Sequence, residues 1–177
     1  MMSDYLRAWI PGGKYFFTVN LAERRGNTLL VDRIHLLRRA FREIRAMHPF
    51  EMQAFVILPE HIHCIWRLPD NDHRFDVRWR LIKTAFSRSL TVNENVSASR
   101  RLRGERGIWQ RRYWEHAIRD EQDWRRHLDY IHYNPVKYGH VRRVADWPHS
   151  SFHRFVQMGM YPKNWAVPFG IDEVDSE

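Results

Sequence analysis

The sequence is poor in cysteine and contains no long apolar run. Its single cysteine, Cys64, excludes an internal disulfide, and the lack of any CxxC pair argues against a structural zinc site built from thiolates. No segment reaches the roughly 20 apolar residues of a membrane-spanning helix, and the first residues include no apolar signal region. We therefore expect a protein of the reducing cytoplasm with no membrane partner.

Lysine is scarce as well, although the chain is basic. Only 4 of the 29 basic residues are lysine, the other 25 are arginine, and the formal net charge is +8. The planar guanidinium group of arginine binds phosphate in a bidentate manner, so this composition favours a nucleic-acid partner. Codon bias could also produce an arginine-rich chain, and charge informs on partners rather than on fold.

Short apolar runs, rich in aromatic and β-branched residues and bounded by Gly or Pro, predict four strands. Helical spacing of apolar residues predicts three helices between and after them, the last one capped by Asp120 and stopped by Pro135. The predicted strands lie at 14–21, 50–59, 61–69 and 108–118, and the predicted helices at 34–44, 79–86 and 121–134.

The resulting order is strand, helix, strand, strand, helix, strand, helix. It predicts an α+β fold, most simply a ferredoxin-like two-layer domain with helices on one face of an antiparallel sheet. With 177 residues, 44% of them hydrophobic, we expect one domain over residues 1–169. The polar segment 91–107 predicts a flexible loop, and residues 170–177 predict an acidic tail, either solvated or lying in a basic cleft.

Two histidines one residue apart stand in the third predicted strand. Side chains at i and i+2 of a strand share one face, so His61 and His63 project together and could bind one divalent metal ion. In a chain with 11 histidines such a pair is weakly specific by itself. Two histidines that are hydrogen-bonded at the edge of the core are the alternative.

The last predicted helix carries a tyrosine and an asparagine on one face. Tyr130 and Asn134 are four residues apart, so a phenol and an amide oxygen would meet the histidines if this helix packs beside them. An ordinary amphipathic tyrosine and a helix-terminal asparagine are the alternatives. Tyr113, Tyr133 and Tyr138 are also close in the sequence but have no asparagine four residues later.

Six sequence blocks stand in the same order as in a known family. They are "IPGGKYFFTV", "PEHIHCIW", "RWRLIK", "WQRRYWEHAIRD", "DYIHYNPVKYG" and "DWPHSSFHRF". From about Tyr5 to Trp165 the chain resembles the REP-associated tyrosine transposases, relatives of the single-tyrosine HUH transposases. The mobile-element members usually have glutamine four residues after the nucleophile, where this chain has the shorter Asn134.

The resemblance implies a metal-dependent endonuclease and strand transferase that recognises hairpin DNA of repetitive extragenic palindromes. Tyr130 would attack single-stranded DNA to form a 5′-phosphotyrosine, and His61, His63 and Asn134 would hold Mg²⁺ or Mn²⁺. Such strand transfer requires no nucleotide cofactor, in agreement with the absence of GxxxxGK[ST] and GxGxxG motifs. It also implies a protein associated with the nucleoid.

Basic side chains near these blocks are the candidates for DNA contact, together with the segment 100–106. They are Arg78, Arg80, Lys83, Arg111 and Arg112. The resemblance implies a monomer, as in the REP-associated branch, whereas the mobile-element relatives form dimers. Whether Tyr130 acts in the active site of its own chain or of a partner therefore stays open. Two other functions also stay open: a catalytically silent hairpin-binding module, and a metal hydrolase with water as the nucleophile.

Overall fold

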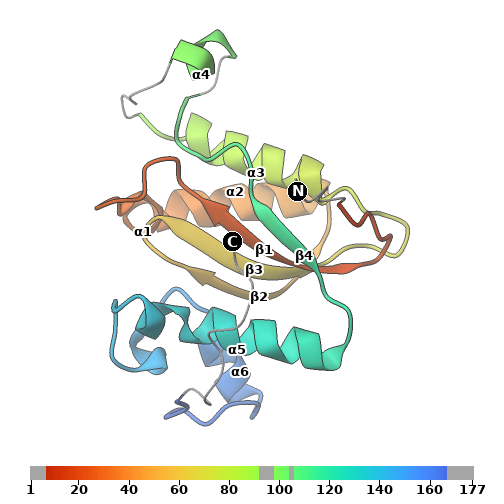
Figure 1. Ribbon diagram of the computed structural model, residues 1–177, viewed down its shortest axis with the longest axis vertical. Helices are drawn as coiled ribbons and strands as arrows, with labels where there is room; N and C mark the ends of the chain where they lie inside the picture. The colour runs from red at the N-terminus through yellow and green to blue at the C-terminus, as the bar shows by residue number, and fades with distance from the viewer. Residues whose placement is uncertain (1–6, 92–97, 104–105, 167–177) are drawn as a thin grey trace, which may run out of the picture.

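The computed structural model describes residues 7–91, 98–103 and 106–166. A four-stranded antiparallel sheet with strand order β2-β3-β1-β4 forms its centre (Figure 1). The strands are β1 (Lys14–Asn20), β2 (Glu51–Ile57), β3 (His61–Arg67) and β4 (Trp114–Ala117). The helices are α1 (Leu29–Asp32), α2 (Ile34–Met47), α3 (Phe75–Arg88), α4 (Ala98–Leu102), α5 (Glu121–Lys137) and α6 (Phe152–Gln157), and η1 (Val144–Asp146) is a 3₁₀ turn.

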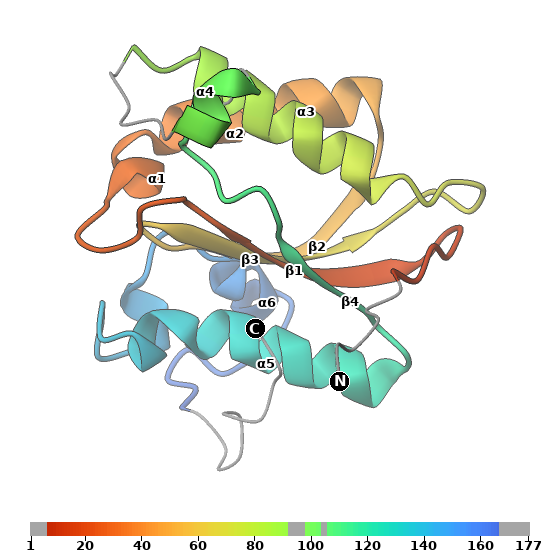
Figure 2. The same ribbon diagram turned by 45° about the horizontal axis from the view of Figure 1, so that its top comes forward.

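The sheet has a hydrophobic cluster on each face. Side chains of a strand alternate between faces, so Phe17 of β1 packs in one cluster with α2 and α3, while Phe16 packs in the other with α5 and α6. The central strands are therefore apolar on both faces and need a cover on both. Figures 1 and 2 show the sheet between α2 and α3 on one side and α5 and α6 on the other.

The predicted α+β fold is confirmed, and the βαββαβ order with both connecting helices on one face is ferredoxin-like. The expectation of only two layers is wrong, because α5 and α6 add a third layer over the second face. Within the described residues, no helix is both long and apolar enough to cross a membrane.

The ends of α5 differ in how well the sequence predicts them. The Asp120 carboxylate accepts a hydrogen bond from the Asp123 N–H at 2.8 Å, which confirms the predicted cap. The predicted stop at Pro135 is wrong, since α5 continues to Lys137 with Pro135 inside it. Proline lacks only its own N–H donor, and the last turn is held by other donors, including Tyr138 N–H to the Asn134 carbonyl at 3.0 Å.

Two further predictions concern loops and ends. The predicted strand 108–118 is regular only over β4, and the segment before it joins the sheet by a single bridge between Trp109 and Leu21. Within the predicted loop 91–107, α4 is a short helix, whereas residues 92–97 and 104–105 lie outside the described residues. The acidic tail, 170–177, lies outside them too.

Candidate active site

His61 and His63 begin β3 and point toward α5. Each is about 1% exposed, and each ring is held through its Nδ1 atom. The His61 Nδ1 lies 2.7 Å from a carboxylate oxygen of Glu60, and the His63 Nδ1 lies 2.8 Å from the Thr18 hydroxyl. The Nε2 atoms of both rings are buried and have no hydrogen-bond partner among the described residues. Both rings are therefore oriented by one nitrogen and have the other available for a ligand.

The electrostatics of the pair agree with this orientation. Burial acts to raise the pKa of Glu60, but its hydrogen bond and attraction to His61, together with Arg24, outweigh burial and lower the pKa to about 2. Glu60 is thus ionised and accepts a hydrogen bond from the Nδ1–H of His61. Burial, with the nearby His61, Arg24 and Lys137, holds the pKa of His63 well below its usual value, so its imidazole is neutral at neutral pH. Neutral imidazole is the form that binds metals.

Helix α5 places one face over the two histidines. The Tyr130 ring lies 5.2 Å from the His63 ring, centre to centre, and the Tyr138 ring at the helix C-cap lies 5.2 Å from the His61 ring. Asn134 is four residues from each tyrosine and therefore lies between them on the same face. It is fully buried, and neither atom of its side-chain amide has a hydrogen-bond partner among the described residues.

The predicted metal ligands thus meet on facing elements, and their donor set fits a divalent cation. Two imidazole nitrogens and one amide oxygen are buried without partners among residues 7–91, 98–103 and 106–166. This state disfavours folding unless another group binds them. Mn²⁺ and Mg²⁺ accept such ligands, and the neutral amide leaves the ion its positive charge for an anionic substrate. Lys137 adds a further positive charge, with its Nζ 5.1 Å from the centre of the Tyr130 ring.

A basic groove of about 780 Å³ lies on the opposite side of the sheet, between α3 and residues 106–113. Arg80 and Arg111 are exposed on its walls, and Lys83 donates to the Gln110 carbonyl at 2.9 Å. Among the described residues that line it, Asp76 is the one acid. The basic ones are Arg7, Arg74, Arg80, Lys83, Arg88, Arg106 and Arg111.

Arg78 is a correction to the predicted DNA contacts. Its side chain is 2% exposed, and its guanidinium donates to the carbonyls of His48, Pro49 and Arg74 and to the Asp72 carboxylate at 2.8–3.2 Å. With its donors used inside the protein, Arg78 ties α3 to the end of α2 and does not reach DNA. Arg112 is exposed beside the groove but does not line it.

Comparison with known proteins decides the family. No family model matches the chain. The REP-associated tyrosine transposase of Escherichia coli (strain K12) is 48% identical over 165 residues, 93% of this chain and 92% of that protein. A Haemophilus influenzae protein named for the same family is 47% identical over 166 residues, 93% of this chain and 94% of its own length. This chain belongs to the REP-associated tyrosine transposases.

A solved structure agrees with this assignment. It is described as a REP-associated tyrosine transposase bound to a REP hairpin, and it matches with a TM-score of 0.83 and 45% identity. The match covers 99% of this chain and 96% of that one. The predicted resemblance and the HUH type of α+β fold are therefore confirmed for this REP-associated tyrosine transposase.

In this REP-associated tyrosine transposase the groove and the histidine pair meet at one end of the sheet. Asn20 closes β1 opposite His61 in the strand register, and the Asn20 carbonyl accepts the Gln110 N–H at 3.0 Å. The groove segment around Trp109 therefore borders the strand end beside the histidines.

The sequence interpretation missed several residues around the site. Thr18 and Glu60 orient the histidines, Lys137 lies against Tyr130, and the Asn20 side-chain oxygen is buried without a hydrogen-bond partner among the described residues. Glu60 precedes His61 directly, and its acidic side chain was a usable signal. Thr18 and Asn20 alternate along the first strand, but the register that sets them opposite the histidines is visible only in the structure.

Proposed function

We propose that this REP-associated tyrosine transposase cuts single-stranded DNA beside a hairpin of a repetitive extragenic palindrome and retains the cut end on Tyr130. Membership of a transposase family implies DNA transesterification. The solved relative is described as bound to a REP hairpin, which supports the same kind of partner here. Metal dependence and the covalent intermediate are the finer parts of the proposal.

In the proposed step the phenolic oxygen of Tyr130 attacks phosphorus, and the bond between phosphorus and the 3′ oxygen breaks. The phenol gives up its proton to water, and the departing 3′ oxygen takes one from water. The products are a 5′-phosphotyrosine and a free 3′ hydroxyl, so one phosphate ester replaces another. Attack by a 3′ hydroxyl reverses the step or joins a new strand, which explains why no nucleotide is needed.

Neighbouring side chains support this step. His61, His63 and Asn134 would hold Mg²⁺ or Mn²⁺, which when bound neutralises charge on a non-bridging phosphate oxygen. Glu60 and Thr18 hold the two imidazoles in place, and the Lys137 ammonium lies over the Tyr130 ring. Imidazole ligands suit Mn²⁺ better than Mg²⁺.

One observation carries the proposal. Three side-chain atoms that suit a metal ion, one each from His61, His63 and Asn134, are buried under the same helix face that carries Tyr130, and none has a hydrogen-bond partner in the described part of the chain. A pure binding module has no use for this arrangement, which leaves polar groups unsatisfied. The Tyr130 ring lies against His63 of the same chain, and this contact supports catalysis within a single monomer.

DNA must enter a site that is closed in this structure. Tyr130 and both histidines are buried, whereas Tyr138 is 46% exposed and its ring lies against His61. The proposal therefore expects Tyr138 to move when the scissile strand binds. Phosphates of the hairpin would contact Arg80, Lys83, Arg111 and Arg112, along the groove that ends beside Asn20.

The test is a denaturing gel after incubation of the protein with Mn²⁺ and a labelled single-stranded hairpin oligonucleotide carrying an unpaired flank. We expect a covalent protein–DNA product that Tyr130→Phe abolishes, while the same variant binds the hairpin within about twofold of the parent, because only the attacking oxygen is lost. Tyr133→Phe is the matched control, because it makes the same change about one helix turn away on α5. It should keep the product.

The other outcomes identify the alternatives. Undiminished covalent product from Tyr130→Phe contradicts the assigned nucleophile. Hairpin binding with no cutting by the parent protein identifies a silent binding module. Cutting that leaves no covalent product at any time identifies water as the nucleophile.

A further inference from the structure

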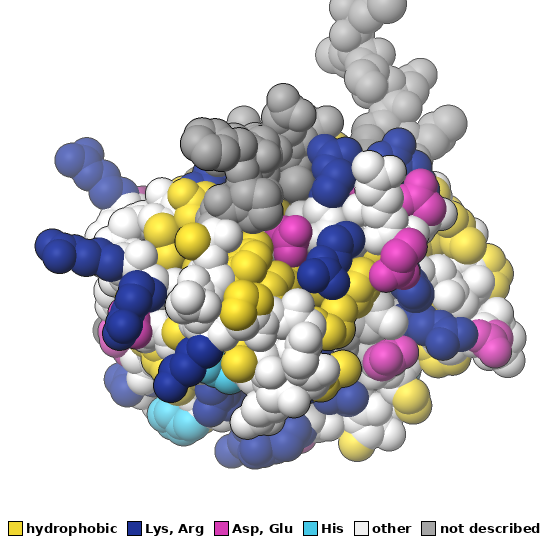
Figure 3. All heavy atoms as spheres, turned by 90° about the horizontal axis from the view of Figure 1, so that it is seen from below, with side chains coloured by type: hydrophobic (Ala, Val, Ile, Leu, Met, Phe, Trp, Pro, Cys, Tyr) yellow, Lys and Arg dark blue, Asp and Glu magenta, His cyan; other side chains and the backbone are white. Residues whose placement is uncertain are grey.

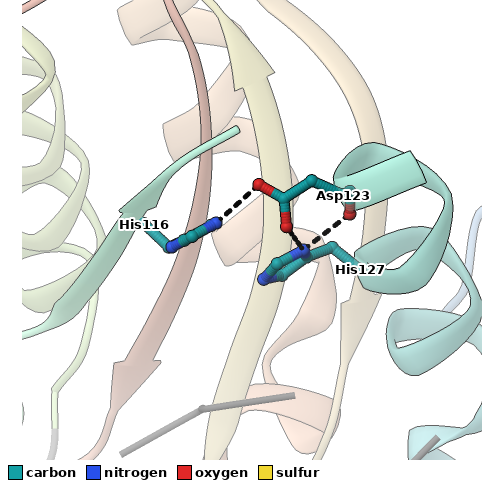
Figure 4. A group of neighbouring side chains, drawn as sticks. All are labelled: His116, Asp123 and His127. Carbon is teal, nitrogen blue, oxygen red and sulfur yellow. Dashed lines mark hydrogen bonds and ion pairs between the residues drawn. The ribbon is translucent and has the colours of Figure 1, made fainter. Parts of the chain in front are cut away.

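A second group of metal-binding side chains lies on the same helix as Tyr130. His116 comes from β4, and Asp123 and His127 come from the first two turns of α5 (Figure 4). The His116 Nε2 lies 2.8 Å from one carboxylate oxygen of Asp123, and the His127 Nδ1 lies 3.2 Å from the other. Each residue offers a ligand atom, and these atoms lie within 4.8 Å of one another.

This cluster is separate from the HUH pair. The Phe16 ring stands between them, with its centre 5.6 Å from the His63 ring and 4.8 Å from the His127 ring. Phe16 pairs with His116 in the strand register, while Thr18, the partner of His63, is two residues further along β1. An apolar side chain therefore divides two polar clusters on one face of the sheet.

We propose that His116, Asp123 and His127 form a zinc site that clamps β4 to α5. Two imidazoles and one carboxylate are a common ligand set for Zn²⁺, and a fourth position would be left for water. Asp123 and His127 are four residues apart and so share one helix face, as paired metal ligands on helices do.

Two further observations support a ligand at this position. The Asp123 Oδ1 is buried, faces His127 and makes no hydrogen bond to the described residues that meets normal geometry. The His116 side chain is 27% exposed, whereas those of Asp123 and His127 are nearly buried, so an ion has one open side for entry. Such an arrangement combines a preformed donor set with an access path.

Binding of the ion requires local exchanges. Hydrogen bonds now join the cluster. Arg119 donates to the Asp123 Oδ2, the oxygen that faces His116, through its backbone N–H at 3.0 Å and its Nε at 3.2 Å. The Arg119 side chain is 68% exposed, so its guanidinium can leave without a cavity forming. His127 also donates from Nδ1 to the Asp123 carbonyl at 2.8 Å, and this bond would give way to the metal.

The clamp would act on the element that carries the proposed nucleophile. His127 is three residues before Tyr130 on α5, and β4 is the edge strand next to β1. Zinc at this position would hold the first turns of the helix against the sheet. The inference does not depend on the proposed cleavage reaction.

The experiment is a zinc titration by calorimetry on the double variant His61→Ala and His63→Ala, which removes the HUH pair. We expect one equivalent of Zn²⁺ to bind and to raise the melting temperature by several degrees. Adding His116→Ala should remove both effects, whereas His35→Ala, an exposed histidine on α2, should leave them unchanged. Circular dichroism checks that each variant is folded.

A spectroscopic measurement avoids any change in the cluster itself. Co²⁺ added to the double variant should give the visible absorption bands of a bound low-symmetry cobalt ion, and Zn²⁺ should displace them. Absence of zinc binding by the double variant, or unchanged binding after His116→Ala, overturns the proposal. Either result leaves the test of Tyr130 unaffected, because that test reads a DNA adduct.

Discussion

At the scale of single residues, the two imidazoles of the HUH pair are held by different partners. An ionised carboxylate, Glu60, holds His61, and a neutral hydroxyl, Thr18, holds His63. Neither partner would touch a bound metal. Such outer partners set ring orientation and ligand basicity, so they control metal affinity indirectly.

Thr18→Val tests this control, since valine keeps the shape of threonine and removes its hydroxyl. We expect the Mn²⁺ concentration for half-maximal adduct formation to rise roughly 10- to 100-fold, the usual effect of losing an outer partner of a metal ligand. Thr91→Val, at an exposed position after α3, is the control and should leave it unchanged. An unaltered Mn²⁺ requirement in Thr18→Val would show that the hydroxyl does not orient His63.

Asp72 is expected to contribute stability that depends on pH. Its hydrogen bond from the buried Arg78 outweighs partial burial and lowers its pKa below the ordinary value of 3.8. The carboxylate therefore stabilises the fold above that pH, and the contribution is lost as pH falls through the lowered pKa. Asp72→Asn should cost about 1–3 kcal/mol at pH 7 by urea unfolding, and less below about pH 4.

The control is Asp70→Asn, which removes a carboxylate whose side chain is 92% exposed and should cost less than about 0.5 kcal/mol. A cost for Asp72→Asn that stays constant from pH 7 down to well below about pH 4 would contradict the assigned ion pair.

At the scale of elements, α5 is the part that brings the site together. Its buried polar side chains follow one another at helical spacing, from Asp123 and His127 to Tyr130 and Asn134. Contacts with β2 and α6 help to fix its rotation about its axis. Ser151, before α6, joins these elements, since its hydroxyl lies 2.9 Å from both the Phe55 N–H of β2 and the His132 Nε2 of α5.

Ser151→Ala should therefore destabilise the third layer. The change leaves a buried backbone N–H and an imidazole without their partner, and we expect a loss of about 1–3 kcal/mol in the free energy of unfolding. Ser89→Ala, which removes a hydroxyl that donates to the Phe86 carbonyl of α3, should cost under about 1 kcal/mol. Equal losses for both variants would mean that Ser151 does not join the layers.

The sequence predicts the order of the strands and helices because the spacing of apolar residues within each segment distinguishes a strand from a helix. It does not predict which face of the sheet α5 covers, since the spacing of Leu128 and Ile131 shows a buried side but not the partner. Pro135 misleads for a related reason: proline disfavours a helix interior on average, yet here the last turn is closed by donors beyond it.

The site residues show the same limit. His61, His63, Tyr130 and Asn134 are predicted from local spacing and family resemblance, and the structure places them together. Arg78 and Arg80 look alike in the sequence. Arg78 is nevertheless buried, because carbonyl oxygens some thirty residues earlier in the chain accept hydrogen bonds from its guanidinium. Long-range contacts of this kind leave no local pattern.

At the scale of the whole molecule, charge is distributed for contact with a polyanion. The groove beside α3 is strongly basic. On the side of α5 and α6, Figure 3 shows mainly basic side chains along one edge, and acidic and basic side chains intermingled toward the opposite edge.

Replacing Arg80 and Arg111 by glutamine tests the groove. If each arginine neutralises one phosphate, the slope of log affinity against log salt should become less negative by about 1 per residue, and the loss should be similar for all hairpin sequences. Arg42→Gln, on the exposed side of α2, should leave the slope unchanged. A loss of affinity with no change in slope would contradict phosphate contact.

The central claim is that Tyr130 is the nucleophile beside a metal held by the HUH pair. Its most direct test is mass spectrometry of the protein after reaction with hairpin DNA and Mn²⁺, followed by nuclease and protease digestion. The account predicts a 5′-linked nucleotide on Tyr130 alone, absent when His63 is replaced by alanine. A nucleotide on Tyr113, Tyr133 or Tyr138, or one on Tyr130 that persists without His63, would contradict it.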